Sequence, residues 1–471
     1  MGVVVASCSI AELFANQPIK TSDGQTIQGF LHLPEYQRSY CWQTSQLQRL
    51  LTDLRRHFTQ PPPHKFYLGS IILHQEQREH ETRLNIIDGQ QRLTTMGLLA
   101  WLQNPGSEPK LSYTSLESQK QIIANLADLK QQYSSDLDWL DTESINITLV
   151  VTCSEDDAYR FFETQNTGGV RLTGPDIIKA HHLRATTRNQ QDDYARLWES
   201  LGELQPLVDI ILKARYWQYK LDFRQLPSYR ETSKVRDVVV TELAENTTSE
   251  QSAKDFLYQQ IRITRTAIGT IQETFAGGYA MRQPLNAGIN TINYLHYFHS
   301  LYHRLLNSKS DPEFTDFDDF YKRLICKVDG CGFLKKLFDS CLLYYVSCFG
   351  SEQLFEASLW LFRVVYSPRV INKVSVKEKT VPAFVQDNPV LDWIQMSYNH
   401  SQCIERLSVY SYSATPDNLE NERSIKKRFV NDVFNWFNIT LQESNLAESY
   451  DTEIRNAISL KLKKREVRYG R

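Results

Sequence analysis

The stretch IIDGQQRLTT, from Ile86 to Thr95, decides the fold of the first part of the chain. Two apolar β-branched residues run directly into Asp88 and Gly89, and the residues that follow, 90–102, have a helical pattern. The stretch therefore predicts a strand, a tight turn and a helix in immediate succession. A glycine at the turn permits backbone angles that other residues resist, and it lets a ligand approach the main chain closely.

The beginning of this helix is suited to bind an anion. A helix N-terminus presents unpaired N–H groups and the positive end of the helix dipole, and phosphate is the anion it suits best. Arg92 adds a planar cation in the first turn, and Thr94 and Thr95 add hydroxyl donors. The pattern is not a Walker A loop. An ordinary helix capped by Asp88, with a solvated Arg92, explains the residues about equally well.

Two further segments have an unusual polar content. Residues 33–42 (LPEYQRSYCW) place Gln37 and Arg38 among aromatic residues, which either stack on a base or pack inside the protein, the commoner fate. Residues 161–172 (FFETQNTGGVRL) end a predicted helix with two glycines, as at a helix C-cap. Asn166 precedes these glycines, and it either points into a site or caps the turn.

The hydrophobic pattern divides the chain into three parts, residues 1–190, 191–400 and 401–471. The first part mixes strands and helices. Its predicted strands are 30–33, 66–73, 84–87 and 145–152, and its predicted helices are 45–58, 90–102, 118–133, 155–165 and 174–187. The second part is mostly helical. Its predicted helices include 206–219, 251–274, 291–306, 333–348 and 353–366.

Composition narrows the class of protein. The chain has 53 Lys and Arg against 55 Asp and Glu, which excludes a uniformly basic nucleic-acid coat, although six cations fall within residues 461–471. No apolar run reaches the roughly 18 residues of a membrane span, and the N-terminus does not resemble a signal peptide. The eight cysteines include no CxxC pair. We therefore expect a cytoplasmic protein that does not bind membranes.

Taken together, the three motif segments resemble the GmrS-type, or DGQQR-motif, domain family of phage-defence proteins. Relatives in this family include GmrSD-like modification-dependent restriction enzymes and SspE-like effectors. The matching residues are 33–42, 88–95 and 162–179, in the family's order, and the resemblance covers about residues 10–190.

The resemblance implies an α+β domain with a ParB/sulfiredoxin-like core, followed by a mainly α-helical region. It implies binding, and often hydrolysis, of a nucleoside triphosphate with Mg²⁺. The implied catalytic residues are Asp88, Gln91 and Arg92, and the implied metal ligands are Asp88 and Glu163. The implied nucleotide-binding residues are Gln37, Arg38, Asp88, Gly89, Gln90, Gln91, Arg92, Thr94, Thr95 and Asn166.

Many members of this family also carry a C-terminal HNH nuclease with an I-E-H-I segment. Residues 404–407 read Ile-Glu-Arg-Leu here, so Arg406 stands in the position of the histidine. Arginine neither accepts a proton at neutral pH nor coordinates a cation. Residues 401–471 are therefore interpreted either as a degenerate HNH-like domain or as an unrelated helical tail.

The main functional expectation is a restriction component that binds and hydrolyses a nucleoside triphosphate to control DNA targeting. The targeting is performed by the chain itself or by a separate HNH-type nuclease subunit. One alternative is a single-chain DNA endonuclease whose cleavage site is not recognisable from the sequence. The other is a non-catalytic DNA-binding or assembly scaffold. The oligomeric state is open, a homo-oligomer included.

Overall fold

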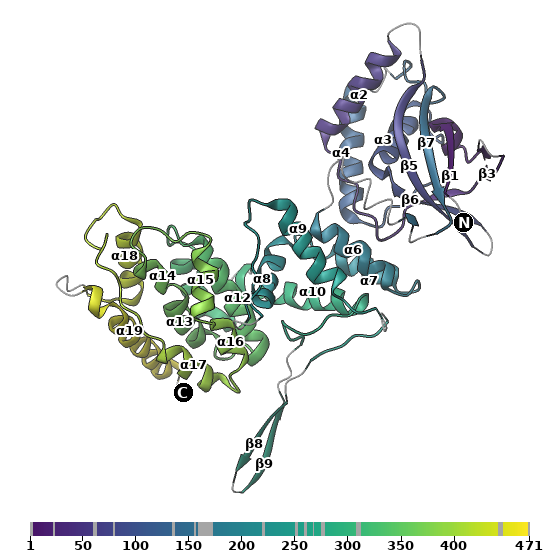
Figure 1. Cartoon of the computed structure of the whole chain (residues 1–471). Helices are drawn as coiled ribbons and strands as arrows, with labels where there is room; N and C mark the ends of the chain where they lie inside the picture. The colour runs from purple at the N-terminus through teal and green to yellow at the C-terminus, as the bar shows by residue number, and fades with distance from the viewer. Residues whose placement is uncertain are drawn as a thin grey trace. The chain divides into compact units, whose positions relative to one another are not determined.

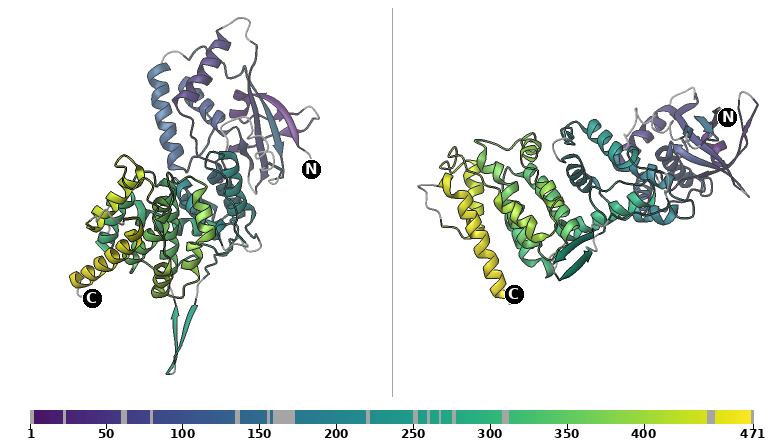
Figure 2. Two further views of the ribbon diagram at one scale, coloured as in Figure 1. Left: turned by 60° about the vertical axis from the view of Figure 1, so that its left-hand side comes forward. Right: turned by 60° about the horizontal axis from the view of Figure 1, so that its bottom comes forward.

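The computed structural model divides the chain into two compact units, Met1–Ser200 and Leu201–Arg471, here called the first and the second unit (Figures 1 and 2). Residues 401–471 belong to the second unit. The residues that the structure describes are 3–21, 24–59, 64–78, 81–133, 137–154, 157–158, 173–218, 222–249, 253–258, 261–266, 268–274, 278–307, 312–440 and 446–469.

The first unit contains a mixed five-stranded sheet with the strand order β1-β7-β5-β6-β4. Its strands are β1 (Val4–Ser9), β4 (Phe30–His32), β5 (Phe66–Gln77), β6 (Thr82–Asp88) and β7 (Ile145–Thr152). The central strand β5 is antiparallel to β6 and parallel to β7. The predicted strands are confirmed, and β1 is an edge strand that the sequence did not reveal. A small second sheet pairs β2 (Ile19–Lys20) with β3 (Thr26–Ile27).

The helices of the first unit cover the sheet. They are α1 (Ile10–Phe14), α2 (Thr44–Phe58), α3 (Gln90–Gln103), α4 (Leu116–Tyr133), α6 (Gly174–Ala185) and α7 (Gln191–Glu199). Leucines of α2, α3 and α4 pack with Ile71 and Ile86 in the main core, so these three helices cover one face (Figure 1). The neighbouring residues Ile72 and Ile87 point to the opposite face, where Ile177 of α6 packs on them.

The second unit is mainly helical, as the sequence predicted. Its α-helices are α8 (Gln205–Tyr216), α9 (Thr232–Val240), α10 (Ile289–Tyr302), α11 (Thr315–Phe320), α12 (Gly332–Phe349), α13 (Leu354–Val365), α14 (Ser367–Ile371), α15 (Thr380–Asp387), α16 (Val390–Gln395), α17 (His400–Val409), α18 (Ile425–Phe437) and α19 (Leu446–Tyr469). Helix α12 packs against α8, α13 and α16, and its side chains from Leu337 to Val346 are all buried. Its burial among these helices explains why the stretch Leu337–Val346 is mostly apolar.

The predicted helix over 251–274 is wrong. The structure has an antiparallel hairpin there, β8 (Ile261–Thr266) with β9 (Gly269–Thr274), which extends away from the helices of its unit (Figure 1). In residues 261–266 and 270–274, Ile and Thr recur among polar residues, and β-branched side chains favour extended backbone. The predicted helix over 155–165 lies almost entirely outside the described residues.

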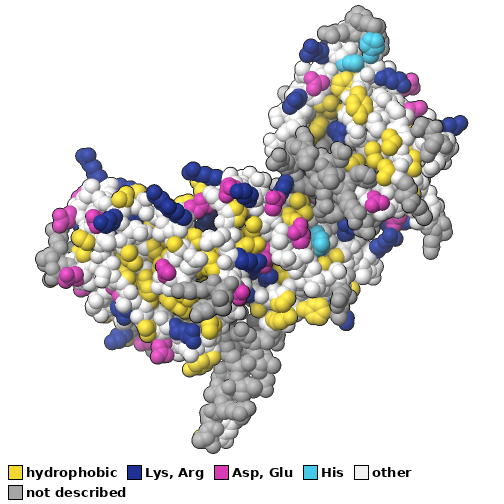
Figure 3. Space-filling model, in the orientation of Figure 1, with side chains coloured by type: hydrophobic (Ala, Val, Ile, Leu, Met, Phe, Trp, Pro, Cys, Tyr) yellow, Lys and Arg dark blue, Asp and Glu magenta, His cyan; other side chains and the backbone are white. Residues whose placement is uncertain are grey.

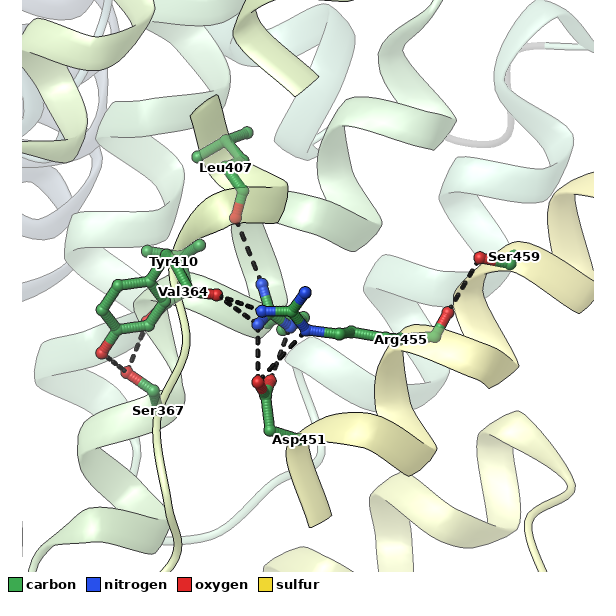
Figure 4. A network of polar contacts seen from close by, with 8 residues as sticks. Val364, Ser367, Leu407, Tyr410, Asp451, Arg455 and Ser459 are labelled. Carbon is green, nitrogen blue, oxygen red and sulfur yellow. Dashed lines mark hydrogen bonds and ion pairs between the residues drawn. The ribbon is translucent and has the colours of Figure 1, made fainter. Parts of the chain in front are cut away.

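A buried ion pair fastens the C-terminal helix to the core of the second unit. The side chain of Arg363 in α13 is 0% exposed. Its Nε and Nη2 donate to the two carboxylate oxygens of Asp451 in α19, at 2.6 and 2.8 Å. Arg363 also donates to the carbonyl oxygen of Leu407, and the partly exposed Arg455 donates to Asp451 as well (Figure 4). Residues 401–471 are thus integrated into the second unit, and their interpretation as a degenerate nuclease stays a prediction.

The surface carries both signs of charge. On the face drawn in Figure 3, Lys and Arg side chains are interspersed with Asp and Glu side chains, as the near-zero net charge suggests. Among the helices that the structure describes, none is both long and apolar enough to cross a membrane.

Candidate functional site

The predicted strand–turn–helix is present at the end of β6. Strand β6 ends at Asp88, Gly89 takes a left-handed conformation with φ of 97°, and α3 begins at Gln90. A β-carbon at Gly89 would lie 2.2 Å from Cδ1 of Ile71, so the turn requires glycine for space as well as for backbone angle. No side chain caps α3 at this N-terminus among the described residues, and its first turn contains no acidic residue.

Arg92 is anchored beside this uncapped turn. Its Nη1 donates to the carbonyl oxygen of Leu68 at 3.2 Å, and its Nη2 donates to that of Ser70 at 2.7 Å. Nη2 also lies 3.1 Å from Oδ2 of Asp88. The side chains of Arg92 and Asp88 remain 23% and 32% exposed. The alternative interpretation, an ordinary capped helix, required a solvated Arg92. In the structure the guanidinium of Arg92 is instead held against the sheet.

Gln90 is the unusual residue of the turn. It is 4% exposed, and neither its amide nitrogen nor its amide oxygen has a hydrogen-bond partner among the described residues. Leaving such a group unpaired costs about 1–3 kcal/mol, so most buried side-chain polar atoms in proteins are paired. Among the described residues of the first unit, a buried amide in this state beside an uncapped helix N-terminus is the feature that most favours a binding site.

Gln91 has the opposite environment. Its Oε1 accepts from the backbone N–H groups of Cys41 and Trp42, at 2.9 and 3.1 Å, and its Nε2 donates to the carbonyl oxygen of Ser39 at 3.0 Å. The side chain thereby fixes residues 39–42 against α3. Its polar atoms are used within the fold, so its geometry is that of a positioning residue.

The two threonines also bond inside the protein. Thr94 Oγ1 lies 2.7 Å from the hydroxyl of Tyr113, whose pKa burial raises to about 12. Thr95 Oγ1 donates to the carbonyl oxygen of Gln91 at 2.9 Å and lies 2.8 Å from the hydroxyl of Tyr40. Tyr40 is fully buried, so the preference for packing over base stacking is confirmed for this aromatic residue.

The segment 33–42 lies next to the end of β6. Gln37 is buried, and its Nε2 donates to the carbonyl oxygen of Ile87 at 2.9 Å. The carbonyl oxygen of Gln37 accepts from Lys179 Nζ, which also pairs with Glu199 at 2.5 Å. Arg38 follows and is partly exposed. The structure thus brings the first motif segment to the second, as the resemblance implied.

The third motif segment contributes fewer described residues to the site. Asn166 and Glu163 lie outside the described residues. No group of three or more His, Cys, Asp or Glu in the described part of the chain is arranged to hold a metal ion. Asp88 is a single partly exposed carboxylate, and this fits Mg²⁺, which is commonly held by one or two carboxylates and the phosphates of a substrate.

One residue of the site was overlooked in the sequence. Gly69 lies inside strand β5 with φ of 115°, directly against Arg92. An isolated glycine within an apolar strand often marks a close approach of another group, so the signal was present in FYLGSIIL.

Two family models match separate parts of the chain. The model of the GmrSD restriction endonuclease N-terminal domain matches residues 12–183. A family of unknown function (DUF7834) matches residues 190–423. None of the curated proteins matches the chain.

The α/β fold and its uncapped turn thus belong to a domain of restriction systems. Residues 12–183 are a GmrSD restriction endonuclease N-terminal domain, which implies a role in restriction, or phage defence.

Proposed function

We propose that the first unit binds a nucleoside triphosphate with Mg²⁺ and hydrolyses it to control DNA targeting. The targeting is by this chain or by a separate HNH-type nuclease subunit. The observation that supports this most strongly is the amide of Gln90, which bonds to no described residue at an uncapped helix N-terminus, with the guanidinium of Arg92 fixed beside it. A ParB/sulfiredoxin-like core is part of the same proposal.

We divide the predicted residues into two groups by their contacts. The phosphates contact the backbone N–H groups that follow Gly89, the amide of Gln90 and the guanidinium of Arg92, and Arg38 adds a cation. The positioning group consists of Gln37, Gln91, Thr94 and Thr95, whose polar atoms bond within the fold.

Asp88 has a role at the metal. One of its oxygens faces Arg92, and the other has no hydrogen bond to a described residue, so it is free to hold Mg²⁺ or to orient the attacking water. The metal, when bound, neutralises charge on the triphosphate. Arg92 keeps Asp88 oriented, and it adds positive charge where the γ-phosphate becomes more negative.

Calorimetric titration of the full chain with each of the four nucleoside triphosphates and Mg²⁺ tests this proposal. We expect binding by the wild type, and a loss of at least about tenfold in affinity for Arg92→Ala. Arg83→Ala, in the same β6 strand, is the matched control, because Arg83 pairs with Glu81 away from the turn.

The two alternatives give different results. Absence of nucleotide binding by the wild type would leave the non-catalytic scaffold. Mg²⁺-dependent nicking of DNA by the purified chain alone would favour the single-chain endonuclease.

A further inference from the structure

The second unit contains a cavity of about 250 Å³ that none of the motif segments contributes to. It is lined from α8 by Lys213, from α9 by Val238, from α12 by Phe333 and from α15 by Val381, and residues 225–229 also line it. All of these residues lie within the match to the family of unknown function. Functional ligand pockets for drug-sized molecules have about 300–1,000 Å³, so this cavity suits one small ligand.

Aromatic side chains form part of the wall. The rings of Tyr229 and Phe333 lie 6.0 Å apart and are tilted by 47° to each other, and Tyr229 is 51% exposed. Trp217 also lines the cavity and is nearly buried. Bases stack readily on such rings, whichever base is present.

Lys213 supplies a cation at the cavity. Its Nζ donates to the carbonyl oxygen of Asp209 at 2.9 Å, the one hydrogen bond of this amine among the described residues, and it lies 6.0 Å from the centre of the Trp217 ring. The pKa of Lys213 is lowered to about 8, chiefly because the amine is buried. An anion bound in the cavity would raise this pKa again, because an opposite charge favours the protonated amine.

Of the two carboxylates at the cavity, Asp209 is paired with a lysine, whereas Glu378 is hydrogen-bonded to neutral donors and keeps its charge. Glu378 accepts from Ser228 Oγ at 2.7 Å and from the backbone N–H of Tyr229 at 2.8 Å. Asp209 accepts from Gln205 Nε2 at 3.0 Å and faces Lys336 Nζ at 3.4 Å. Within the part of the chain that the structure describes, Lys213 and Lys379 line the cavity without an ion pair. The three lysines that line the cavity, Lys213, Lys336 and Lys379, outnumber its two carboxylates, so the formal charge of the lining is 3 − 2 = +1.

We propose that this cavity binds a single nucleotide, with its base on Tyr229 and Phe333 and its phosphate at Lys213 and Lys379. An aromatic wall beside an unpaired cation matches the two halves of a nucleotide, and the volume excludes a much larger ligand. The nucleotide is either free in solution or one unit of a nucleic-acid strand, since both present the same base and phosphate. The site is separate from the one proposed in the first unit.

The test uses the fluorescence of 2-aminopurine, which falls when this base stacks on an aromatic ring. The full chain is titrated into the free 2-aminopurine deoxynucleoside 5′-monophosphate, and into a single-stranded oligonucleotide with one central 2-aminopurine. We expect quenching with at least one of the two probes. Response to the monophosphate identifies a free nucleotide as ligand, and response to the oligonucleotide alone identifies a strand.

Variants assign the signal to this cavity. Lys213→Met and Tyr229→Ala should weaken binding by about tenfold or more, whereas Tyr229→Phe, Lys234→Met on the exposed side of α9, and Arg92→Ala in the first unit should bind like the wild type. Because Tyr229 is half exposed, its variants should fold even if Lys213→Met does not, and thermal melts verify this. Absence of quenching by the wild type, or unchanged binding by Tyr229→Ala, overturns the proposal. Equal competition by inorganic phosphate and by the unlabelled monophosphate also overturns it, because a plain anion site would suffice.

Discussion

A β-carbon at Gly69 would lie 2.3 Å from Nη1 of Arg92, because the guanidinium rests directly on the backbone of strand β5. The carbonyl oxygens on either side of Gly69, those of Leu68 and Ser70, hold this guanidinium. Position 69 therefore determines where the cation of the proposed phosphate site lies, although it is distant from the motif in sequence.

We expect Gly69→Ala to displace Arg92. The methyl group takes the place of the guanidinium, and a φ of 115° is strained for alanine, at a cost of about 1–3 kcal/mol. Urea unfolding and calorimetry with a nucleoside triphosphate should show lower stability and weaker binding. Gly106→Ala is the control, because Gly106 has a similar φ of 103° but open space around it. Equal binding by both variants would contradict the proposed role of Arg92.

The two adjacent glutamines should respond in opposite ways. Gln91→Ala removes the acceptor of two backbone N–H groups and should destabilise the chain by about 1–3 kcal/mol. Gln90→Leu replaces a buried amide that bonds to no described residue and should leave stability unchanged or raise it, while nucleotide affinity falls. Denaturation and calorimetry on both variants separate the effects. A stable Gln91→Ala that no longer binds nucleotide would show that Gln91 contacts the ligand.

Asp451→Asn should destabilise the second unit strongly. The substitution removes the carboxylate from Arg363, whose side chain is 0% exposed, and breaking a buried pair in this way costs about 3–5 kcal/mol. Arg455→Met is the matched control on the same carboxylate. Its side chain is 33% exposed, so its loss should cost about 1 kcal/mol or less. Similar losses of stability in the two variants would contradict this ranking.

Lys426 should make stability depend on pH in the alkaline range. Burial, followed by the charge of Arg369, lowers its pKa from 10.5 to about 8. Between these values the unfolded chain binds a proton that the folded chain does not, so this residue makes stability rise as pH increases from about 8 towards 10.5.

The difference in unfolding free energy between wild type and Lys426→Met isolates this contribution from other titrating groups. The unfolding free energy of the wild type should rise relative to that of Lys426→Met as pH is raised from 8 to 10. The exposed Lys463→Met should give a constant difference over the same range. A constant difference for Lys426→Met as well would show that its folded pKa is ordinary.

The basic end of α19 allows a test of DNA binding. Lys461 lies 3.6 Å from the ring centre of Trp436, and Arg465 pairs with Asp316 at 2.8 Å, whereas Lys463 and Lys464 are exposed. If the proposed DNA partner contacts this end, removing both exposed lysines should reduce the slope of log affinity against log salt by about 1.8. Fluorescence anisotropy with duplex DNA measures the slope, and an unchanged slope indicates a solvated end.

The sequence was sufficient for features that depend on local patterns. The run from Ile86 into Gly89 and onward specified a strand, a turn and a helix, and the structure confirms all three. The hairpin after Ile261 was mistaken for a helix, because its apolar residues fit both periods in a short window.

The distinction between Gln90 and Gln91 was not available from the sequence. It depends on residues 39–42, about fifty positions earlier, and only the packing of that segment on α3 decides which amide is paired. The same holds for Arg92, whose partners lie on another strand. Contacts between residues so distant in sequence are set by the tertiary fold, which a local pattern does not encode.

The internal bonds of Gln91, Thr94 and Thr95 have a consequence for genetics. Substitutions at these positions should lower the amount of folded protein in the cell through chaperone and protease surveillance, and a strain carrying them would lose the proposed protection against phage. A screen that scores only survival would then identify substitutions of Gln91 and of Arg92 alike, although the causes differ. Measuring the cellular level of each variant would distinguish variants that fold poorly from folded variants that bind poorly.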